Sequence, residues 1–167
     1  MKTIKIIAIC ALYISSGASF GYENRHPAQT KAQTRVRQEQ KAWGMAGDAQ
    51  AVRRTITLRM GDNMRFSPRH IEVQEGETVR LRAQNQGKVL HEIVLGTQAD
   101  LEAHAQMMQK HPGMEHDEPD MAHVRPGGRG DIVWHFNRAG TFDFACLIPG
   151  HYQAGMSGTI TVRPRSR

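Results

Sequence analysis

Hydrophobic and polar residues alternate along most of the chain after residue 52, which is the pattern of strands with one buried face. Short runs containing Gly, Asn, Asp or Glu separate the alternating segments and predict turns between them. Seven or eight short strands of this kind predict an all-β fold, specifically an antiparallel Greek-key β-sandwich. The predicted strands are residues 54–60, 71–73, 78–83, 91–95, 131–136, 140–145 and 158–162.

The first 18 residues have the composition of a secretory signal peptide. Lys2 and Lys5 give a basic start, an apolar run follows over residues 6–14, and small residues lead to Ala18, where we expect cleavage. The apolar run is too short to span a bilayer, so the mature protein is expected to have no transmembrane segment. We therefore predict export to the periplasm.

Residues 19–50 are rich in Gln, Lys, Arg and Ala and show little apolar periodicity. They are predicted to form a flexible basic leader, with a docking arm as the alternative. The folded domain is expected over residues 51–163, with an insert at about residues 97–130. The formal charge of +6 is spread unevenly, and no basic patch is interleaved with aromatic residues, so nucleic acid is not expected as a partner.

A loop near the C-terminus carries the residues with the most specific chemistry. Cys146, His151 and Met156 follow one another at five-residue intervals, in a Pro- and Gly-containing loop between two predicted strands. Two His and one Cys in a plane, with a long axial Met, form a mononuclear blue-copper site. A buried Cys or a core Met is the ordinary alternative for each residue alone, but it does not explain why all three share one loop.

Cys146 becomes the only thiol once the signal peptide, which contains Cys10, is removed. A disulfide within the mature chain is then excluded, and a single thiol in an oxidising compartment is a liability unless a metal occupies it. The second imidazole is expected from His91, which opens an earlier predicted strand. A sandwich can bring that strand end beside the final loop, so that rigid elements hold the ligands.

These residues are part of a wider resemblance. The segment from about residue 54 to residue 162 resembles the cupredoxins, which are type 1 blue-copper proteins, and the Cys-x4-His-x4-Met spacing is similar to that of rusticyanin-like and auracyanin-like proteins. The resemblance implies a copper cofactor that cycles between Cu(I) and Cu(II). The motifs that carry it are Met-Arg-Phe-Ser-Pro at 64–68, Val-Gln-Glu-Gly at 73–76, Asn-Gln-Gly at 85–87, His-Glu at 91–92, Gly-Thr-Phe-Asp-Phe-Ala-Cys at 140–146 and Pro-Gly-His at 149–151. The implied copper ligands are His91, Cys146, His151 and axial Met156.

The same loop excludes two related kinds of copper protein. A dinuclear centre of the oxidase type needs a second Cys four positions after Cys146, and position 150 is Gly. Multicopper oxidases flank this Cys with His, whereas Ala145 and Leu147 flank it here. We therefore expect a mononuclear site without catalytic residues, in a protein that is not an enzyme; Cu(I) oxidation is the weaker enzymatic alternative.

The residue after His91 departs from the pattern of many electron-carrying cupredoxins. They have Asn or a similar residue there, whereas this chain has Glu92. We expect the carboxylate of Glu92 to face solvent. The alternative is that it faces the site and tunes the reduction potential of the copper.

The insert is acidic and contains four of the nine His and four of the nine Met of the chain. Asp100 is expected to N-cap a short helix that ends before Pro112 and carries His and Met on one face. That face either packs on the sandwich or, together with the polar segment after it, supplies auxiliary copper ligands. We predict the second case. The eight candidates are His104, Met107, Met108, His111, Met114, His116, Met121 and His123.

Two functions from different classes fit this pattern. The first is copper tolerance by sequestration, transfer or Cu(I) oxidation, because the insert makes the chain resemble periplasmic copper-resistance cupredoxins. Its expected partners are copper ions and a copper-handling or redox protein. The second is a soluble blue-copper electron carrier between redox partners, which the metal loop alone supports equally well.

Overall fold

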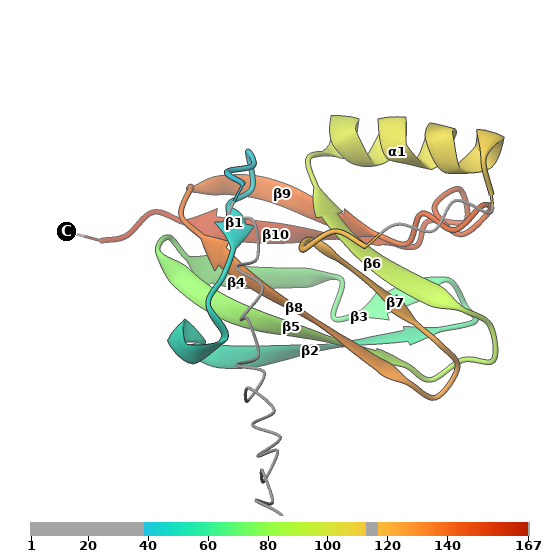
Figure 1. Cartoon of the computed structure of the whole chain (residues 1–167), viewed down its shortest axis with the longest axis horizontal. Coiled ribbons are helices and arrows are strands. Elements are labelled where there is room, and N and C mark those ends of the chain that lie inside the picture. The colour runs from blue at the N-terminus through green and yellow to red at the C-terminus, as the bar shows by residue number, and fades with distance from the viewer. Residues whose placement is uncertain (1–38, 113–116, 167) are drawn as a thin grey trace, which may run out of the picture. The chain divides into compact units, whose positions relative to one another are not determined.

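The computed structural model of the protein describes residues 39–112 and 117–166 (Figure 1). The predicted signal peptide, the leader up to residue 38, and Met114 and His116 of the insert lie outside these residues. Within the described ranges, no helix is long and apolar enough to cross a membrane. The elements in chain order are β1 (Met45–Ala46), η1 (Ala49–Ala51), β2 (Arg54–Gly61), β3 (Arg65–Ser67), β4 (His70–Gln74), β5 (Glu77–Asn85), β6 (His91–Gly96), α1 (Gln98–Lys110), β7 (Met121–Val124), β8 (Arg129–Phe136), β9 (Gly140–Ala145) and β10 (Ser157–Arg163).

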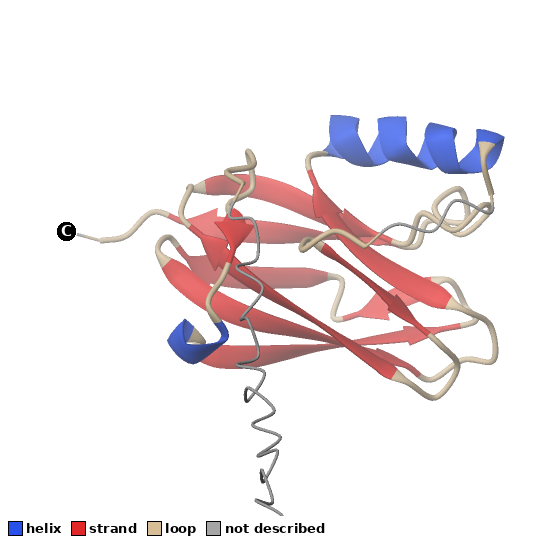
Figure 2. Ribbon diagram, in the orientation of Figure 1, coloured by secondary structure: helices blue, strands red, loops and turns tan. Residues whose placement is uncertain are grey.

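The strands of the described residues form two five-stranded sheets that pack as a sandwich (Figure 2). One sheet has the order β1-β8-β5-β2-β3 and the other has the order β4-β10-β9-β6-β7. Most neighbouring strands are antiparallel, whereas β2 with β5 and β4 with β10 run parallel. The first parallel pair arises because the chain contributes β4 to the other sheet before it returns as β5 beside β2. The predicted all-β sandwich is confirmed, with these two parallel pairs added.

The core comes from the inward positions of the alternating strands. On β5, Val79, Leu81 and Ala83 are completely buried, and β8 alternates in the same way. Full burial of one large aliphatic side chain stabilises the fold by about 1.5–3 kcal/mol relative to exposure. Trp134 of β8 is also buried, and its indole N–H donates to the backbone carbonyl of Trp43 at 2.8 Å. Its polar atom is therefore satisfied inside the core.

The leader was predicted over residues 19–50, but residues 39–50 belong to the folded domain, so the predicted leader was too long at its C-terminal end. Trp43 and Ala46 are 8% and 5% exposed and join the core. The short strand β1 pairs with β8, where Met45 lies opposite His135. This segment has too few apolar residues to produce a periodicity, which is why the sequence pattern does not reveal it.

The predicted helix of the insert is present as α1, but it begins before Asp100. Thr97 is the N-cap, and its side-chain oxygen accepts from the backbone N–H of Asp100 at 3.2 Å. Leu101, Ala105 and Met108 are buried on the face of α1 that packs on β6 and β9. Figure 1 shows α1 lying across the side of this sheet that faces away from the other sheet.

Beyond α1 the insert forms a strand that the sequence did not predict. This strand, β7, pairs antiparallel with β6 at the edge of the sheet. Met121 and Val124 are buried, whereas Ala122 and His123 are half-buried. Four residues that include a His in an acidic segment give no clear alternation, so the insert was expected to continue to about residue 130.

Candidate metal centre

Three of the predicted copper ligands meet between β6 and the loop that follows β9. His91 is the first residue of β6, Cys146 directly follows β9, and His151 lies in the loop. Val94 of β6 pairs with Ala145 of β9, so the antiparallel register carries Cys146 to the position opposite residue 93. His91 lies two residues from that position, on the same face of the strand. The ligand atoms of the three side chains all lie within 4.8 Å of one another.

The distances within this group suit a single metal ion. Nδ1 of His151 lies 3.2 Å from Sγ of Cys146 and 3.3 Å from Nδ1 of His91. The two imidazole rings are tilted by 54° to each other. Two imidazole nitrogens and one sulfur form the donor set of a trigonal type 1 copper site, and both donor types suit copper.

Backbone hydrogen bonds close the metal loop and fix Met156. The N–H of Cys146 donates to the carbonyl of Met156 at 3.0 Å, and the N–H of Met156 donates to the carbonyl of His151 at 3.1 Å. Gly150 and Gly155 have φ angles of 90° and 88°, in the left-handed region that favours glycine. Met156 is completely buried in the same apolar cluster as Cys146. The structure therefore places the backbone of the predicted axial residue beside that of Cys146, with both side chains in one apolar cluster.

Burial raises the pKa of the Cys146 thiol to about 12. The backbone N–H of Glu92 donates to Sγ at 3.4 Å, which partly offsets this rise of the pKa. A thiol with such a pKa stays protonated at neutral pH, so a soft metal ion must displace the proton when it binds. A metal ion that binds Sγ of Cys146 would therefore release the proton of this thiol.

The two imidazoles favour the neutral form that binds metal. Burial lowers the pKa of both His91 and His151, and for His91 the nearby carboxylate of Asp62 opposes this shift. Nε2 of His91 lies 3.5 Å from Oδ1 of Asp62, so its Nδ1 is the atom that faces His151. The backbone N–H of Lys88 donates to Asp62 at 2.8 Å and lowers the pKa of that carboxyl. An imidazole oriented by a carboxylate is usual for a metal ligand.

Glu92 is buried, so the prediction that it faces solvent was wrong. It is 2% exposed. Its Oε1 accepts from the backbone N–H of Leu147 at 2.8 Å, and its Oε2 lies 2.9 Å from Nε2 of His123. Every residue of β6 is buried, because α1 packs on this strand and the chain after Cys146 contacts it. The alternation rule assumes one solvated face, and β6 has none.

Three of the eight predicted auxiliary ligands have other contacts in the structure. Met108 and Met121 are 5% and 7% exposed and pack in a second apolar cluster together with Leu147. His123 lies beside the carboxylate of Glu92. For Met108 the structure has the alternative, a helix face that packs on the sandwich. Met121 and His123 were expected in an exposed polar segment, but Met121 is buried and His123 is half-buried.

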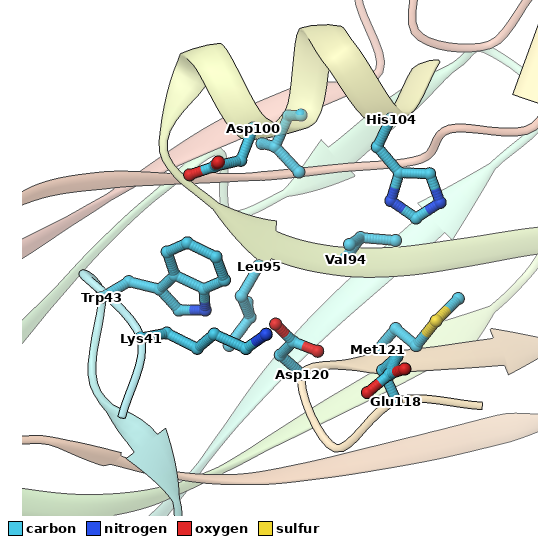
Figure 3. A pocket seen from close by; sticks show the side chains of 10 residues that line it. Lys41, Trp43, Val94, Leu95, Asp100, His104, Glu118, Asp120 and Met121 are labelled. Carbon is cyan, nitrogen blue, oxygen red and sulfur yellow. The ribbon is translucent and has the colours of Figure 1, made fainter. Parts of the chain in front are cut away.

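The other described members of the predicted auxiliary set lie along α1. Met107 and His111 are exposed, and His111 is the C-cap of the helix. His104 lines a pocket of about 220 Å³ with Asp100 and Asp120 (Figure 3). Burial raises the pKa of Asp120 there. Among the described residues, the only three His, Cys, Asp or Glu side chains with ligand atoms within 4.8 Å are those of the main site.

The chain was compared with known proteins. Residues 52–163 match the family model described as copper binding proteins, plastocyanin/azurin family. The copper-resistant cuproprotein CopI of Rubrivivax gelatinosus is 52% identical over 121 residues, which cover 72% of this chain and 73% of that protein. The protein of the same name from Pseudomonas aeruginosa is 38% identical over 153 residues, covering 74% of this chain and 84% of that protein.

The fold is also similar to that of a solved blue-copper structure. Dithionite-reduced auracyanin from the photosynthetic bacterium Roseiflexus castenholzii matches with a TM-score of 0.58 and 26% identity, over 66% of this chain and 97% of that chain. The family match includes both β6 and the metal loop, so it covers all four predicted ligands of the main site.

Proposed function

Because this chain belongs to the plastocyanin/azurin family of copper-binding proteins, we propose that it binds copper at one mononuclear type 1 site, with weaker auxiliary binding by the insert, and acts in copper tolerance. The carrying observation is the convergence of one thiol and two imidazoles within 4.8 Å, in a chain whose relatives are named copper-resistant cuproproteins. The proposed ligands are His91, Cys146, His151 and axial Met156.

The residues around the site support a protein that holds copper in either oxidation state. Thiolate and thioether suit Cu(I), whereas imidazole suits Cu(II) as well. The ligands come from paired strands and from a loop fixed by its own hydrogen bonds, so the ion can change charge with little rearrangement. These properties suit sequestration of copper, its transfer to a partner, or oxidation of Cu(I) to Cu(II).

His151 is the ligand through which copper and partners gain access. It is half-buried, whereas His91 and Cys146 have no exposed surface. Val89 and Leu90 directly precede His91 and are 42% and 43% exposed, which offers apolar surface to a copper-handling or redox protein. We propose that the protein meets such partners in the periplasm, after removal of its first 18 residues.

A soluble electron carrier is the second candidate function. The exposed apolar pair Val89 and Leu90 favours it, because weak redox complexes form through small surfaces around a metal site. The buried site and its partly exposed imidazole serve electron transfer as well as they serve copper storage. The two candidate functions share the same metal chemistry and differ in their physiological role.

Copper titration with elemental analysis and visible spectroscopy tests the binding. We expect one tightly bound copper per chain and an intense charge-transfer band. Deletion of the gene tests the purpose: growth on copper should fall and should be restored by the wild-type chain but not by Cys146→Ser. If deletion impairs respiration and leaves copper tolerance unchanged, the carrier function replaces the one proposed.

A further inference from the structure

Glu92 and His123 face each other across two paired strands beside the metal loop. In the register of β6 with β7, Glu92 lies directly opposite His123. Oε2 of Glu92 is 2.9 Å from Nε2 of His123. The side chain of His123 is 28% exposed and that of Glu92 is 2% exposed. The pair therefore extends from the surface at β7 to the buried side of the metal loop.

Glu92 also holds both sides of the Cys146–Leu147 peptide. Its backbone N–H donates to Sγ of Cys146 at 3.4 Å, and its Oε1 accepts from the N–H of Leu147 at 2.8 Å. One residue of β6 therefore fixes the sulfur and the backbone that follows it. A buried carboxylate without partners would be strongly unfavourable, and His123 together with the N–H of Leu147 satisfies it.

We propose that Glu92 and His123 form a positioning pair that fixes the Cys146 loop on β6 and biases bound copper toward Cu(II). This inference rests on the proposed copper site. Neither residue is a ligand in it. His123, predicted as an auxiliary ligand, orients the Glu92 carboxylate instead.

The bias follows from the placement of charge. The carboxylate of Glu92 contacts the backbone of the metal loop, and the imidazole of His123 lies between this carboxylate and solvent. A negative charge in a poorly solvated site stabilises a dication more than a monocation, because Coulomb interactions are stronger there than in water. Oε1 of Glu92 accepts from the N–H of Leu147 at 2.8 Å, so the carboxylate lies beside the backbone of the residue that directly follows Cys146.

The first test compares Glu92→Gln with Glu77→Gln in the copper-loaded full chain. Glu77 is a matched control away from the site, because it also accepts a backbone N–H, from Gln74 at 3.0 Å, and contacts a cationic side chain, Arg54 at 2.6 Å. Glu92→Gln should weaken Cu(II) binding relative to Cu(I) binding about tenfold, which raises the reduction potential by about 59 mV for a one-electron couple. Glu77→Gln should leave the potential unchanged.

The second test needs no copper and uses His123, which is exposed enough to tolerate substitution. In the copper-free chain, His123→Ala should release the Glu92 carboxylate and speed hydrogen exchange of the Leu147 amide about tenfold by NMR. His135→Ala is the control, because His135 is a half-buried strand residue whose Nδ1 contacts the Thr78 hydroxyl at 3.0 Å. It should leave the Leu147 amide unchanged.

The outcomes separate this inference from the proposed function. If the copper-loaded wild-type chain shows no charge-transfer band, the proposed copper site itself is refuted. If the band is present but Glu92→Gln shifts the potential no more than Glu77→Gln does, the bias toward Cu(II) is refuted. Unchanged exchange at Leu147 in His123→Ala refutes the positioning role.

Discussion

The metal loop at 146–156 and the insert at about 97–130 are both rich in metal-binding residue types, yet these residues have different contacts in the structure. The loop places its thiol and imidazole beside His91, with ligand atoms within 4.8 Å. The insert buries Met108 and Met121 as packing residues and turns His123 toward Glu92. Density of His and Met along a sequence is therefore a weaker signal than spacing on a loop that two paired strands hold in place.

The largest expected effect is the loss of the site on substitution of its thiol. Cys146→Ser should abolish the intense visible band, because the band requires copper bound to a thiolate. Copper affinity should fall by more than the roughly 10–100-fold that loss of a partner behind a ligand costs. Visible absorption and competition with a copper chelator measure both. The matched change in the insert is Met121→Leu, which should keep the band because Met121 packs in an apolar cluster. A band that survives in Cys146→Ser would overturn the ligand assignment.

The second prediction concerns stability and uses two neighbouring methionines of α1. Met108→Ala should lower the free energy of unfolding by about 2–5 kcal/mol, because a buried side chain is lost and a cavity remains. Met107→Ala is the matched control, since Met107 is 38% exposed, and its effect should stay within about 0.5 kcal/mol. Urea unfolding of the copper-free chain measures both. Equal effects would mean that α1 does not pack on β6 and β9 as described.

How far the sequence predicts these features depends on what surrounds each segment. The alternation that predicted β5 and β8 is a local property of the sequence. The spacing of Cys146, His151 and Met156 is local too, so both could be predicted from the sequence alone. The burial of Glu92 could not be predicted in this way, because it depends on α1 and the metal loop, which cover β6. The burial of Trp43 was not predicted for the same reason. This single aromatic residue joins the core only because β1 pairs with β8.

The third prediction is a pH dependence that belongs to the metal loop. The thiol of Cys146 has an ordinary pKa of 9.0, and burial raises it to about 12 in the folded chain. Between these values the unfolded chain loses the proton and the folded chain keeps it. The stability from the neutral thiol is therefore complete below pH 9 and is lost as the pH rises toward 12.

The expected loss is about 1.4 kcal/mol for each pH unit above that of the unfolded thiol, measured relative to Cys146→Ser. Urea unfolding of both copper-free proteins at a series of alkaline pH values isolates this contribution, because all other titrating groups are shared. Parallel pH profiles for the two proteins would show that the thiol is not shielded from water.

The smallest expected effect concerns the side chains of α1 that remain candidates for auxiliary copper binding. The triple variant with Ala at His104, Met107 and His111 should keep the first equivalent of copper and its visible band. It should lose only copper bound above one equivalent, because the ligands of the main site lie on β6 and on the loop after β9 and not on α1. Equilibrium dialysis at increasing copper measures the uptake. If uptake above one equivalent is unchanged, these three side chains bind no copper, and the role of α1 is to cover β6.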